Sequence, residues 1–279
     1  MDWVSPPYTV CHHDEYYRNV VQEHAMNLFD LTGRVAVITG TSRGIGRELA
    51  HGFANAGAKV VGCARTTGAA ERTAKEICDL GFDAVGLEAD VTNPESCEAL
   101  VQAAVARHGR LDILVCNAGI NINKPAIDFS AAEFDMVISG NLRAYFLCAQ
   151  AAARQFMRQG SSGVIVMNSS NASVAAFERL TPYCAAKAGV DMLVRSLATE
   201  WGPQGIRVNA FNPGYTNHSM TSEGQVFLKD ADRDIIARTP LRRKAQLKEM
   251  VGPAIFLASD AASFITGTIL LVDGGWCAC

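Results

Sequence analysis

From Leu31 onward the chain alternates short β-rich runs with longer stretches of helical periodicity. The β-rich runs are 34–40, 59–65, 83–90, 111–119, 163–170, 206–214 and 267–275, and the helical stretches are 45–57, 94–108, 131–159, 182–201 and 247–259. Several runs are continuously apolar, as in parallel strands covered on both faces. This alternation is typical of a doubly wound sheet. The sequence therefore predicts an α/β fold, a single Rossmann-type domain with a seven-stranded parallel sheet flanked by helices.

Two parts of the chain fall outside this alternation. Residues 1–27 are polar and aromatic and lack the basic and apolar regions of a secretory signal. We expect them to form an N-terminal extension that docks on the domain or on a sister subunit, or is partly disordered, before a domain of residues 28–279. Residues 215–245 carry no strand pattern. Because ligands of open α/β sheets bind beyond the carboxyl ends of the strands, we expect this segment to be a substrate lid.

Composition excludes several classes of partner. Hydrophobic residues make up 49% of the 279 residues, enough to fill a large core. The 25 basic and 28 acidic residues give a net charge of -3 and are spread along the chain, so no basic face for nucleic acid is expected. No apolar run approaches the roughly 18 residues that would span a membrane. A small-molecule partner is therefore expected.

The cysteines indicate a reduced, cytoplasmic protein without a metal site. Their number, nine, is odd, and most share no ligand spacing. Only Cys277 and Cys279 form a close pair, which could bind metal or become oxidised, or be a small apolar tail.

The first predicted strand runs directly into a glycine-rich turn, TGTSRGIG at 39–46, which is followed by an amphipathic helical pattern. Glycines allow a tight turn and a close approach to a diphosphate, whose charge the amides of the helix start would meet. The spacing G-x-x-x-G-x-G departs from the G-x-G-x-x-G fingerprint, but its place between strand and helix predicts a dinucleotide site. The turn residues expected to bind the cofactor are Gly40, Ser42, Arg43, Gly44, Ile45 and Gly46.

The end of the second predicted strand indicates which dinucleotide is bound. An acidic residue there would bind the ribose 2′-hydroxyl of NAD(H), whereas a basic residue would pair with the 2′-phosphate of NADP(H). The run ends at Arg65, no carboxylate follows before Glu71, and Arg43 lies in the glycine turn. We therefore expect NADP(H) in preference to NAD(H), the alternative being that both arginines are surface side chains.

Three residues in the second half of the chain suggest proton transfer. Tyr183 and Lys187 are spaced i and i+4 and would share a helix face, with Thr181 as the helix cap and Pro182 in the first turn. A neighbouring ammonium lowers the pKa of a phenol, so Lys187 is expected to lower that of Tyr183. Ser170 ends the fifth predicted strand. Its hydroxyl can therefore meet the phenol beside a dinucleotide, an arrangement suited to hydride transfer.

Taken together, these motifs resemble those of the short-chain dehydrogenase/reductase family. TGTSRGIG, the N-A-G motif at 117–119 and the Ser170, Tyr183, Lys187 pattern carry the resemblance, which runs from about Leu31 to Trp276. It implies that Tyr183 is the general acid/base, that Lys187 lowers its pKa and holds the nicotinamide ribose, and that Ser170 binds the reacting oxygen. Asn141 matches the asparagine that helps position a water relaying protons to the lysine.

The resemblance also implies further cofactor contacts. Asp90 and Val91 would lie next to the adenine. Asn117, Ala118 and Gly119 stand at the end of the fourth strand, and Pro213 and Gly214 would lie near the nicotinamide. The family usually has a threonine five residues after that proline, where this chain has His218. Thr216 or Ser219 could substitute for it.

The resemblance implies an NADP(H)-dependent oxidoreductase acting on a ketone or secondary alcohol. "LFDLTG", "NAGIN" and "VDGGW" are similar to stretches of gluconate and deoxygluconate dehydrogenases, which suggests a sugar-acid, polyol or other small hydroxylated substrate. The alternatives are a 3-oxoacyl thioester reductase and a noncatalytic dinucleotide-binding regulator. A homo-oligomer, tetramer or dimer, formed through 131–159 and 182–201 is also implied.

Overall fold

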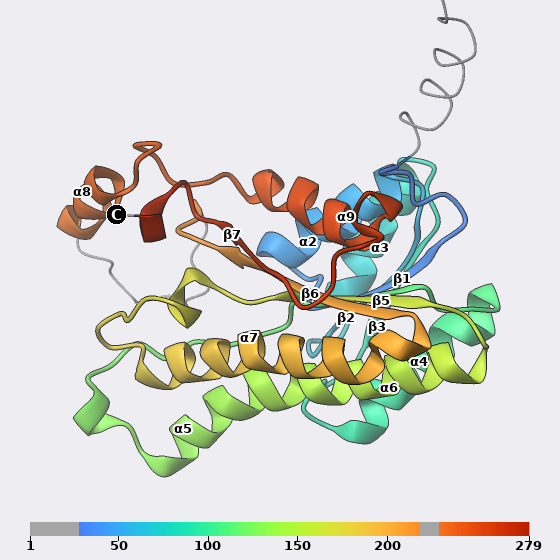
Figure 1. The fold of residues 1–279 in the computed structure, drawn as a ribbon, viewed down its shortest axis with the longest axis horizontal. Helices are drawn as coiled ribbons and strands as arrows, with labels where there is room; N and C mark the ends of the chain where they lie inside the picture. The colour runs from blue at the N-terminus through green and yellow to red at the C-terminus, as the bar shows by residue number, and fades with distance from the viewer. Residues whose placement is uncertain (1–27, 218–228, 279) are drawn as a thin grey trace, which may run out of the picture.

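A seven-stranded parallel sheet forms the centre of the molecule (Figure 1). The structure is a computed structural model and describes residues 28–217 and 229–278. The strands are β1 (Val35–Thr39), β2 (Lys59–Ala64), β3 (Ala84–Glu88), β4 (Ile113–Cys116), β5 (Gly163–Asn168), β6 (Ile206–Pro213) and β7 (Ile269–Val272), in the order β3-β2-β1-β4-β5-β6-β7. Each lies within a predicted run, which confirms the predicted sheet. Residues 1–27 and 218–228 lie outside the described part.

Helices cover both faces of the sheet in two layers (Figure 1). One layer consists of α2 (Gly44–Asn55), α3 (Ala69–Asp79) and α9 (Val251–Ala258), and the other of α4 (Pro94–His108), α6 (Ala144–Arg158) and α7 (Thr181–Trp201). Each layer encloses its own apolar core against the strands. Two further helices, α5 (Ala131–Ile138) and α8 (Lys229–Arg238), extend beyond these layers. The doubly wound architecture is thus as predicted.

The order of strands reverses at β1, which pairs with β2 on one side and with β4 on the other. In the register of β1 and β4, Ile38 lies opposite Val115. The residues that follow these two strands, the glycine turn and the N-A-G motif, are therefore neighbours. Such a switch point opens a crevice at the carboxyl ends of the strands, where ligands of this fold bind.

Several helices differ from their predicted form. The stretch 131–159 consists of α5, a π-helical turn over Ser139–Arg143, and α6. Helix α3 was not among the predicted helical stretches, and α8 falls inside 215–245, for which a lid without strands was expected. The predicted cap of α7 was wrong, because Leu180 occupies the N-cap position and Thr181 is the first helical residue, while Pro182 stands in the first turn as expected.

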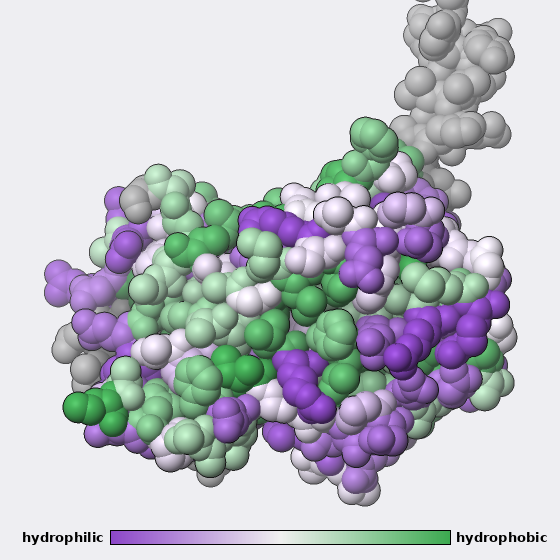
Figure 2. All heavy atoms as spheres, turned by 60° about the horizontal axis from the view of Figure 1, so that its bottom comes forward, coloured by the Kyte–Doolittle hydropathy of each residue, from purple (hydrophilic) through white to green (hydrophobic). Residues whose placement is uncertain are grey.

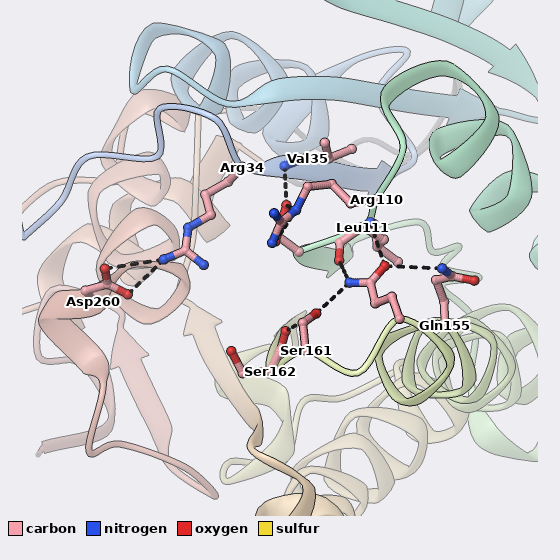
Figure 3. A network of polar contacts seen from close by, with 10 residues as sticks. Arg34, Val35, Arg110, Leu111, Gln155, Ser161, Ser162 and Asp260 are labelled. Carbon is pink, nitrogen blue, oxygen red and sulfur yellow. Dashed lines mark hydrogen bonds and ion pairs between the residues drawn. The ribbon is translucent and has the colours of Figure 1, made fainter.

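A polar network fastens the amino ends of β1 and β4, at the edge opposite the crevice (Figure 3). The buried carboxylate of Asp112 accepts hydrogen bonds from Val35 N at 2.9 Å and from Arg110 Nε at 2.9 Å. Beside it, Arg34 Nη2 lies 3.3 Å from Asp260 Oδ1 in an exposed ion pair. The strand ends are thus fixed away from the crevice, and the opposite ends remain open for a ligand.

Candidate functional site

A cavity of about 1120 Å³ opens at the carboxyl ends of the strands. All predicted cofactor and catalytic residues except Asn141 line it: Gly40, Ser42, Arg43, Gly44, Ile45, Gly46, Arg65, Asp90, Val91, Asn117, Ala118, Gly119, Ser170, Tyr183, Lys187, Pro213, Gly214 and Thr216. The fold therefore gathers residues that are up to 176 positions apart in the sequence, from Gly40 to Thr216, around one cavity.

The glycine turn needs glycine for two physical reasons. Gly40 adopts φ +74°, and a Cβ there would lie 2.8 Å from Ala118 Cα. A Cβ on Gly46 would lie only 2.1 Å from Gly40 O. The turn is held by Cys63 O, which accepts hydrogen bonds from the amides of Gly40 and Thr41 at 2.9 and 3.0 Å. The main chain at the start of α2 thus stays open to the cavity, and this geometry fits the diphosphate of a dinucleotide.

Three exposed arginines line the cavity: Arg43, Arg65 and Arg72. Asp90 is the only carboxylate among the described lining residues. Its oxygen accepts hydrogen bonds from Thr92 N and Oγ1, and chiefly the backbone bond, with a smaller contribution from Arg65, lowers the pKa of Asp90. Sequence reasoning missed Arg72, because the helix that carries it was not predicted.

Asn117 connects the glycine turn to the middle of the site. Its Nδ2 donates to Thr39 O at 2.9 Å and to Gly40 O at 3.2 Å. Its Oδ1 accepts a 2.8 Å hydrogen bond from Asn168 Nδ2. Thr39 Oγ1 in turn accepts from the backbone amides of Asn117 and Ala118. The N-A-G motif therefore holds the turn in place from the neighbouring strand.

Ser170 and Tyr183 meet at the cavity as predicted. Ser170 follows β5 and Tyr183 lies in the first turn of α7, and both are buried. Burial raises the pKa of Tyr183 to about 12, and a hydrogen bond with the Ser170 side chain opposes this shift. The net shift of the Tyr183 pKa is therefore upward, opposite to the expected lowering, because removal from water dominates; Lys187 Nζ lies 5.6 Å from the centre of the Tyr183 ring.

Lys187 is buried and held by two groups that the sequence analysis did not identify. Its Nζ donates to Asn168 O at 2.7 Å and to the hydroxyl of Tyr145 at 3.2 Å. Burial lowers the pKa of Lys187 to about 7, while the charge of Asp191 acts in the opposite direction. One signal was available in the sequence, because Tyr145 stands four residues after Asn141 and so shares its side of the helical segment.

Asn141 does not line the cavity, and its side chain is fully buried within the π-helical turn. Its Nδ2 donates to Ile120 O and Val137 O, each at 2.8 Å, and its Oδ1 accepts from Ile120 N at 3.2 Å. The side chain therefore fixes the main chain of the helix against the segment that follows the N-A-G motif. This turn is where π-helical geometry interrupts the α-helix, a feature frequent at functional sites.

The two ends of segment 215–245 lie side by side and contribute to the wall of the cavity. Ala245 N donates to Tyr215 O and Asn217 N donates to Ala245 O, each at 2.9 Å. Tyr215 packs against Phe177 and Trp276, with ring centres 5.8 and 6.1 Å away. Thr216 lines the cavity, whereas His218 and Ser219 lie outside the described residues.

Within 28–217 and 229–278, no three His, Cys, Asp or Glu side chains come together as a metal site. No helix in those ranges has the length and apolar character needed to cross a membrane. Burial raises the pKa of Cys277 to about 12, and Cys279 is outside the described part.

Comparison with known proteins agrees with this geometry. The family described as "Enoyl-(Acyl carrier protein) reductase" matches residues 40–277. The 2-dehydro-3-deoxy-D-gluconate 5-dehydrogenase of Dickeya dadantii is 38% identical over 255 residues, which are 91% of this chain and 99% of that protein. The gluconate 5-dehydrogenase of Gluconobacter oxydans is 39% identical over 254 residues, 89% of this chain and 96% of that protein.

Solved structures agree as well. The crystal structure of a gluconate 5-dehydrogenase from Burkholderia cenocepacia in complex with NADP and tartrate has a TM-score of 0.87 and 37% identity, covering 92% of this chain and 100% of that chain. A putative NAD(P)-dependent gluconate 5-dehydrogenase from Beutenbergia cavernae, with bound NADP, has a TM-score of 0.85 and 39% identity, covering 91% and 100%. The chain therefore belongs to the short-chain dehydrogenase/reductase family and is an NAD(P)-dependent oxidoreductase.

Proposed function

We propose that the protein is an NADP(H)-dependent oxidoreductase that transfers a hydride between nicotinamide and a ketone or secondary alcohol, with Tyr183 as general acid/base. One observation carries the proposal: Ser170, Tyr183 and Lys187 border the same cavity as the glycine turn. A phenol, a hydroxyl and an amine beside a dinucleotide cradle are the groups that carbonyl reduction requires.

Different residues of the site bind the cofactor, bind the substrate and transfer the proton. The glycine turn and Asn117 hold the dinucleotide, which supplies the hydride when bound. Ser170 and Tyr183 bind the substrate oxygen. Because the pKa of Tyr183 is about 12, its phenol is protonated at neutral pH and can donate to that oxygen during reduction. In the oxidative direction the phenolate form of Tyr183 accepts the proton of the alcohol. Lys187, with its amine in the cavity wall, binds the ribose and stabilises the phenolate.

The three arginines support the preference for NADP(H). Arg43, Arg65 and Arg72 all line the cavity, and guanidinium groups suit a phosphate. Asp90, the described carboxylate in this region, is engaged by Thr92. Two of the similar solved structures are described with NADP bound.

For the substrate we favour a sugar acid, polyol or other small hydroxylated compound. The names of the similar dehydrogenases, which refer to gluconate and 2-dehydro-3-deoxy-D-gluconate, support this choice. A second candidate is a 3-oxoacyl thioester reductase, which the description of the matching family favours. The dehydrogenase names of the relatives argue against a noncatalytic regulator.

Segment 215–245 is proposed to cover the substrate. Tyr215, Thr216, Ile235 and Lys244, all from its described parts, line the cavity and support this role. The domain of residues 28–279 would then combine the cofactor and substrate sites in a single unit.

We also expect a homo-oligomer, a tetramer or dimer in which a second copy covers α6 and α7. Figure 2 turns this helical layer toward the viewer and shows apolar areas between hydrophilic ones. Phe146, Met157 and Met192 are 38%, 46% and 57% exposed there. Light scattering during gel filtration tests the expectation, and a monomer at micromolar concentration would contradict it.

A substrate panel with both cofactors tests the proposed activity. NADPH oxidation is followed with keto-sugar acids and with acetoacetyl thioesters, and NADP⁺ reduction with the matching alcohols. Turnover of keto-sugar acids supports the first candidate, and turnover confined to the thioesters supports the second. Absence of turnover with every carbonyl and alcohol, despite tight cofactor binding, would contradict both.

A further inference from the structure

The amine of Lys187 sits in a closed triangle of hydrogen bonds. Lys187 Nζ donates to Asn168 O at 2.7 Å and to Tyr145 Oη at 3.2 Å. Tyr145 Oη itself donates to the same carbonyl, Asn168 O, at 2.9 Å. The Tyr145 side chain is fully buried, and Lys187 Nζ lies 4.7 Å from the centre of its ring.

Counting donors and acceptors shows what this triangle does. A phenol has a single proton, and that of Tyr145 is committed to Asn168 O, so towards Lys187 its hydroxyl can only accept. Two N–H groups of Lys187 are thereby used. A neutral amine has no further N–H, whereas an ammonium has a third. Because Lys187 lines the cavity, the protonated form retains one donor for a ligand there.

We infer that Tyr145 is a positioning residue for Lys187: its hydroxyl holds the amine in the orientation and in the protonated form that present one N–H to the cavity. The inference rests on the proposed function of Lys187 as a ribose-binding and phenolate-stabilising group. It concerns a side chain that belongs to none of the motifs described above.

Other groups face Lys187 as well. Asp191, four residues further along α7, favours the charged amine, and so does Cys116 from β4. Tyr183 presents its ring at 5.6 Å. Burial acts against the charge, and the pKa of Lys187 is about 7 as a result. Since the pKa of Lys187 lies near physiological pH, the hydrogen bond that Tyr145 accepts from the amine shifts the balance towards the charged form in this proposal.

The substitution Tyr145→Phe removes the hydroxyl and keeps the ring, so it tests the contribution of the hydroxyl alone. It keeps the aromatic contact with Lys187 and the bulk of the core, and it removes the acceptor for Lys187 together with the bond that the hydroxyl donates to Asn168 O. Because a hydrogen bond to the charged form raises the pKa of an amine, its loss should lower the pKa of Lys187 by about one unit. Neutral Lys187 then becomes dominant at a lower pH.

The direct measurement uses the protein without cofactor. In protein labelled with ¹³C at lysine Cε, the Lys187 resonance is assigned with Lys187→Arg and titrated with pH. We expect the midpoint to fall by about one unit in Tyr145→Phe. An unchanged midpoint overturns the inference. Should Tyr145→Phe fail to fold, 3-fluorotyrosine at position 145 keeps the shape and weakens the acceptor, and a smaller fall is expected; no fall would again overturn it.

The kinetic measurement connects the bond to turnover. Activity that needs the ammonium falls as pH rises through the Lys187 pKa, so in Tyr145→Phe the fall should begin about one unit lower and leave about tenfold less activity above both midpoints. The control Ser259→Ala also removes a buried hydroxyl that donates to a carbonyl, Phe256 O at 3.0 Å, but remote from the cavity.

The outcomes are distinguishable. A profile that moves in Tyr145→Phe but not in Ser259→Ala supports the inference, and equal loss of stability with no movement of either profile contradicts it. If the wild-type protein shows no carbonyl or alcohol turnover, the proposed function fails, while the ¹³C titration still decides whether Tyr145 controls the charge of Lys187.

Discussion

Asn168 Nδ2 lies 2.8 Å from Asn117 Oδ1, and this hydrogen bond joins the glycine turn to the amine of Lys187. Asn117 holds the turn through Thr39 O and Gly40 O, and Asn168 holds Lys187 through its main-chain carbonyl. The glycine turn and Lys187, the proposed cofactor cradle and a residue proposed to act in proton transfer, are thus parts of one polar network that crosses from β4 to β5.

The first prediction concerns this bond. Asn168→Ala should leave Asn117 Oδ1 without its partner and weaken NADPH binding by about tenfold, the effect of about 1.4 kcal/mol. Titration by tryptophan fluorescence measures the change. Asn209→Ala is the control, because this buried amide bonds Ile265 O and Thr268 N away from the cavity. An equal loss of NADPH affinity in both variants would contradict the prediction.

Removing the phenol hydroxyl of Tyr183 should separate binding from chemistry. Tyr183→Phe retains the ring, so cofactor affinity should stay within about twofold, whereas kcat should fall by about 10²–10⁴-fold, the usual contribution of a general acid/base. Steady-state kinetics with NADPH and fluorescence titration give the two numbers. Unchanged kcat would remove Tyr183 from the mechanism.

Charge reversal at Arg65 should discriminate between the two cofactors. Arg65→Glu should weaken NADPH binding by about 10- to 100-fold, because a charge-assisted bond to the 2′-phosphate is lost, and should leave NADH nearly unaffected. Lys59→Glu makes the same change of charge at the exposed first residue of β2, the strand that Arg65 follows, and serves as control. Equal effects of Arg65→Glu on both cofactors would count against the NADP(H) preference.

The pH dependence of stability should reflect His108. Its side chain is 3% exposed, and burial lowers its pKa, so the folded protein keeps it neutral where an unfolded chain takes up a proton. Stability should therefore fall as pH drops below about 6.5, and the fall should be smaller in His108→Gln. Urea unfolding at pH 7 and pH 5 measures both slopes. Identical slopes would rule out this source.

Stability should depend on Asp112 far more than on Asp260. Asp112→Ala leaves the buried amide of Val35 unpaired, which costs about 1–3 kcal/mol. Asp260→Ala removes an ion pair whose side chains are 40% and 68% exposed, worth about 0–1 kcal/mol. Both changes lie at the edge of the sheet away from the cavity, so NADPH affinity should not change. Chemical denaturation that ranks the two equally would contradict the prediction.

The strands were predictable because parallel strands buried on both faces leave continuous apolar runs in the sequence. Helix α3 left no such trace, because it is buried mainly through alanines such as Ala70 and Ala74. These small side chains let the helix approach β3 so closely that a Cβ on Gly86 would lie 2.2 Å from Ala70 C. Helix α8 is predominantly polar, so its sequence holds too few apolar residues to show a helical pattern.

At the site, motifs predicted the residues that line the cavity but not those that support them. Asn168 holds Lys187 through its backbone carbonyl. Every residue has such a carbonyl, so the residue type does not predict this contact. In the sequence Tyr145 lies within an apolar helical stretch, although its hydroxyl accepts a hydrogen bond from Lys187. The pKa of Tyr183 could not be predicted either, because it depends on how deeply the fold buries the phenol.

The pairing of Tyr215 and Asn217 with Ala245 has a consequence for how the protein can diverge. Two backbone hydrogen bonds fasten the ends of this segment independently of its interior, so a longer or shorter interior leaves β6 and β7 in register. The entropy of closing a loop grows slowly, by about 0.6 kcal/mol for each doubling of length. With the proposed role of this segment as a substrate cover, descendants of this chain can acquire new substrates by insertions, deletions and substitutions within one stretch, while the residues of the proposed reaction stay in place.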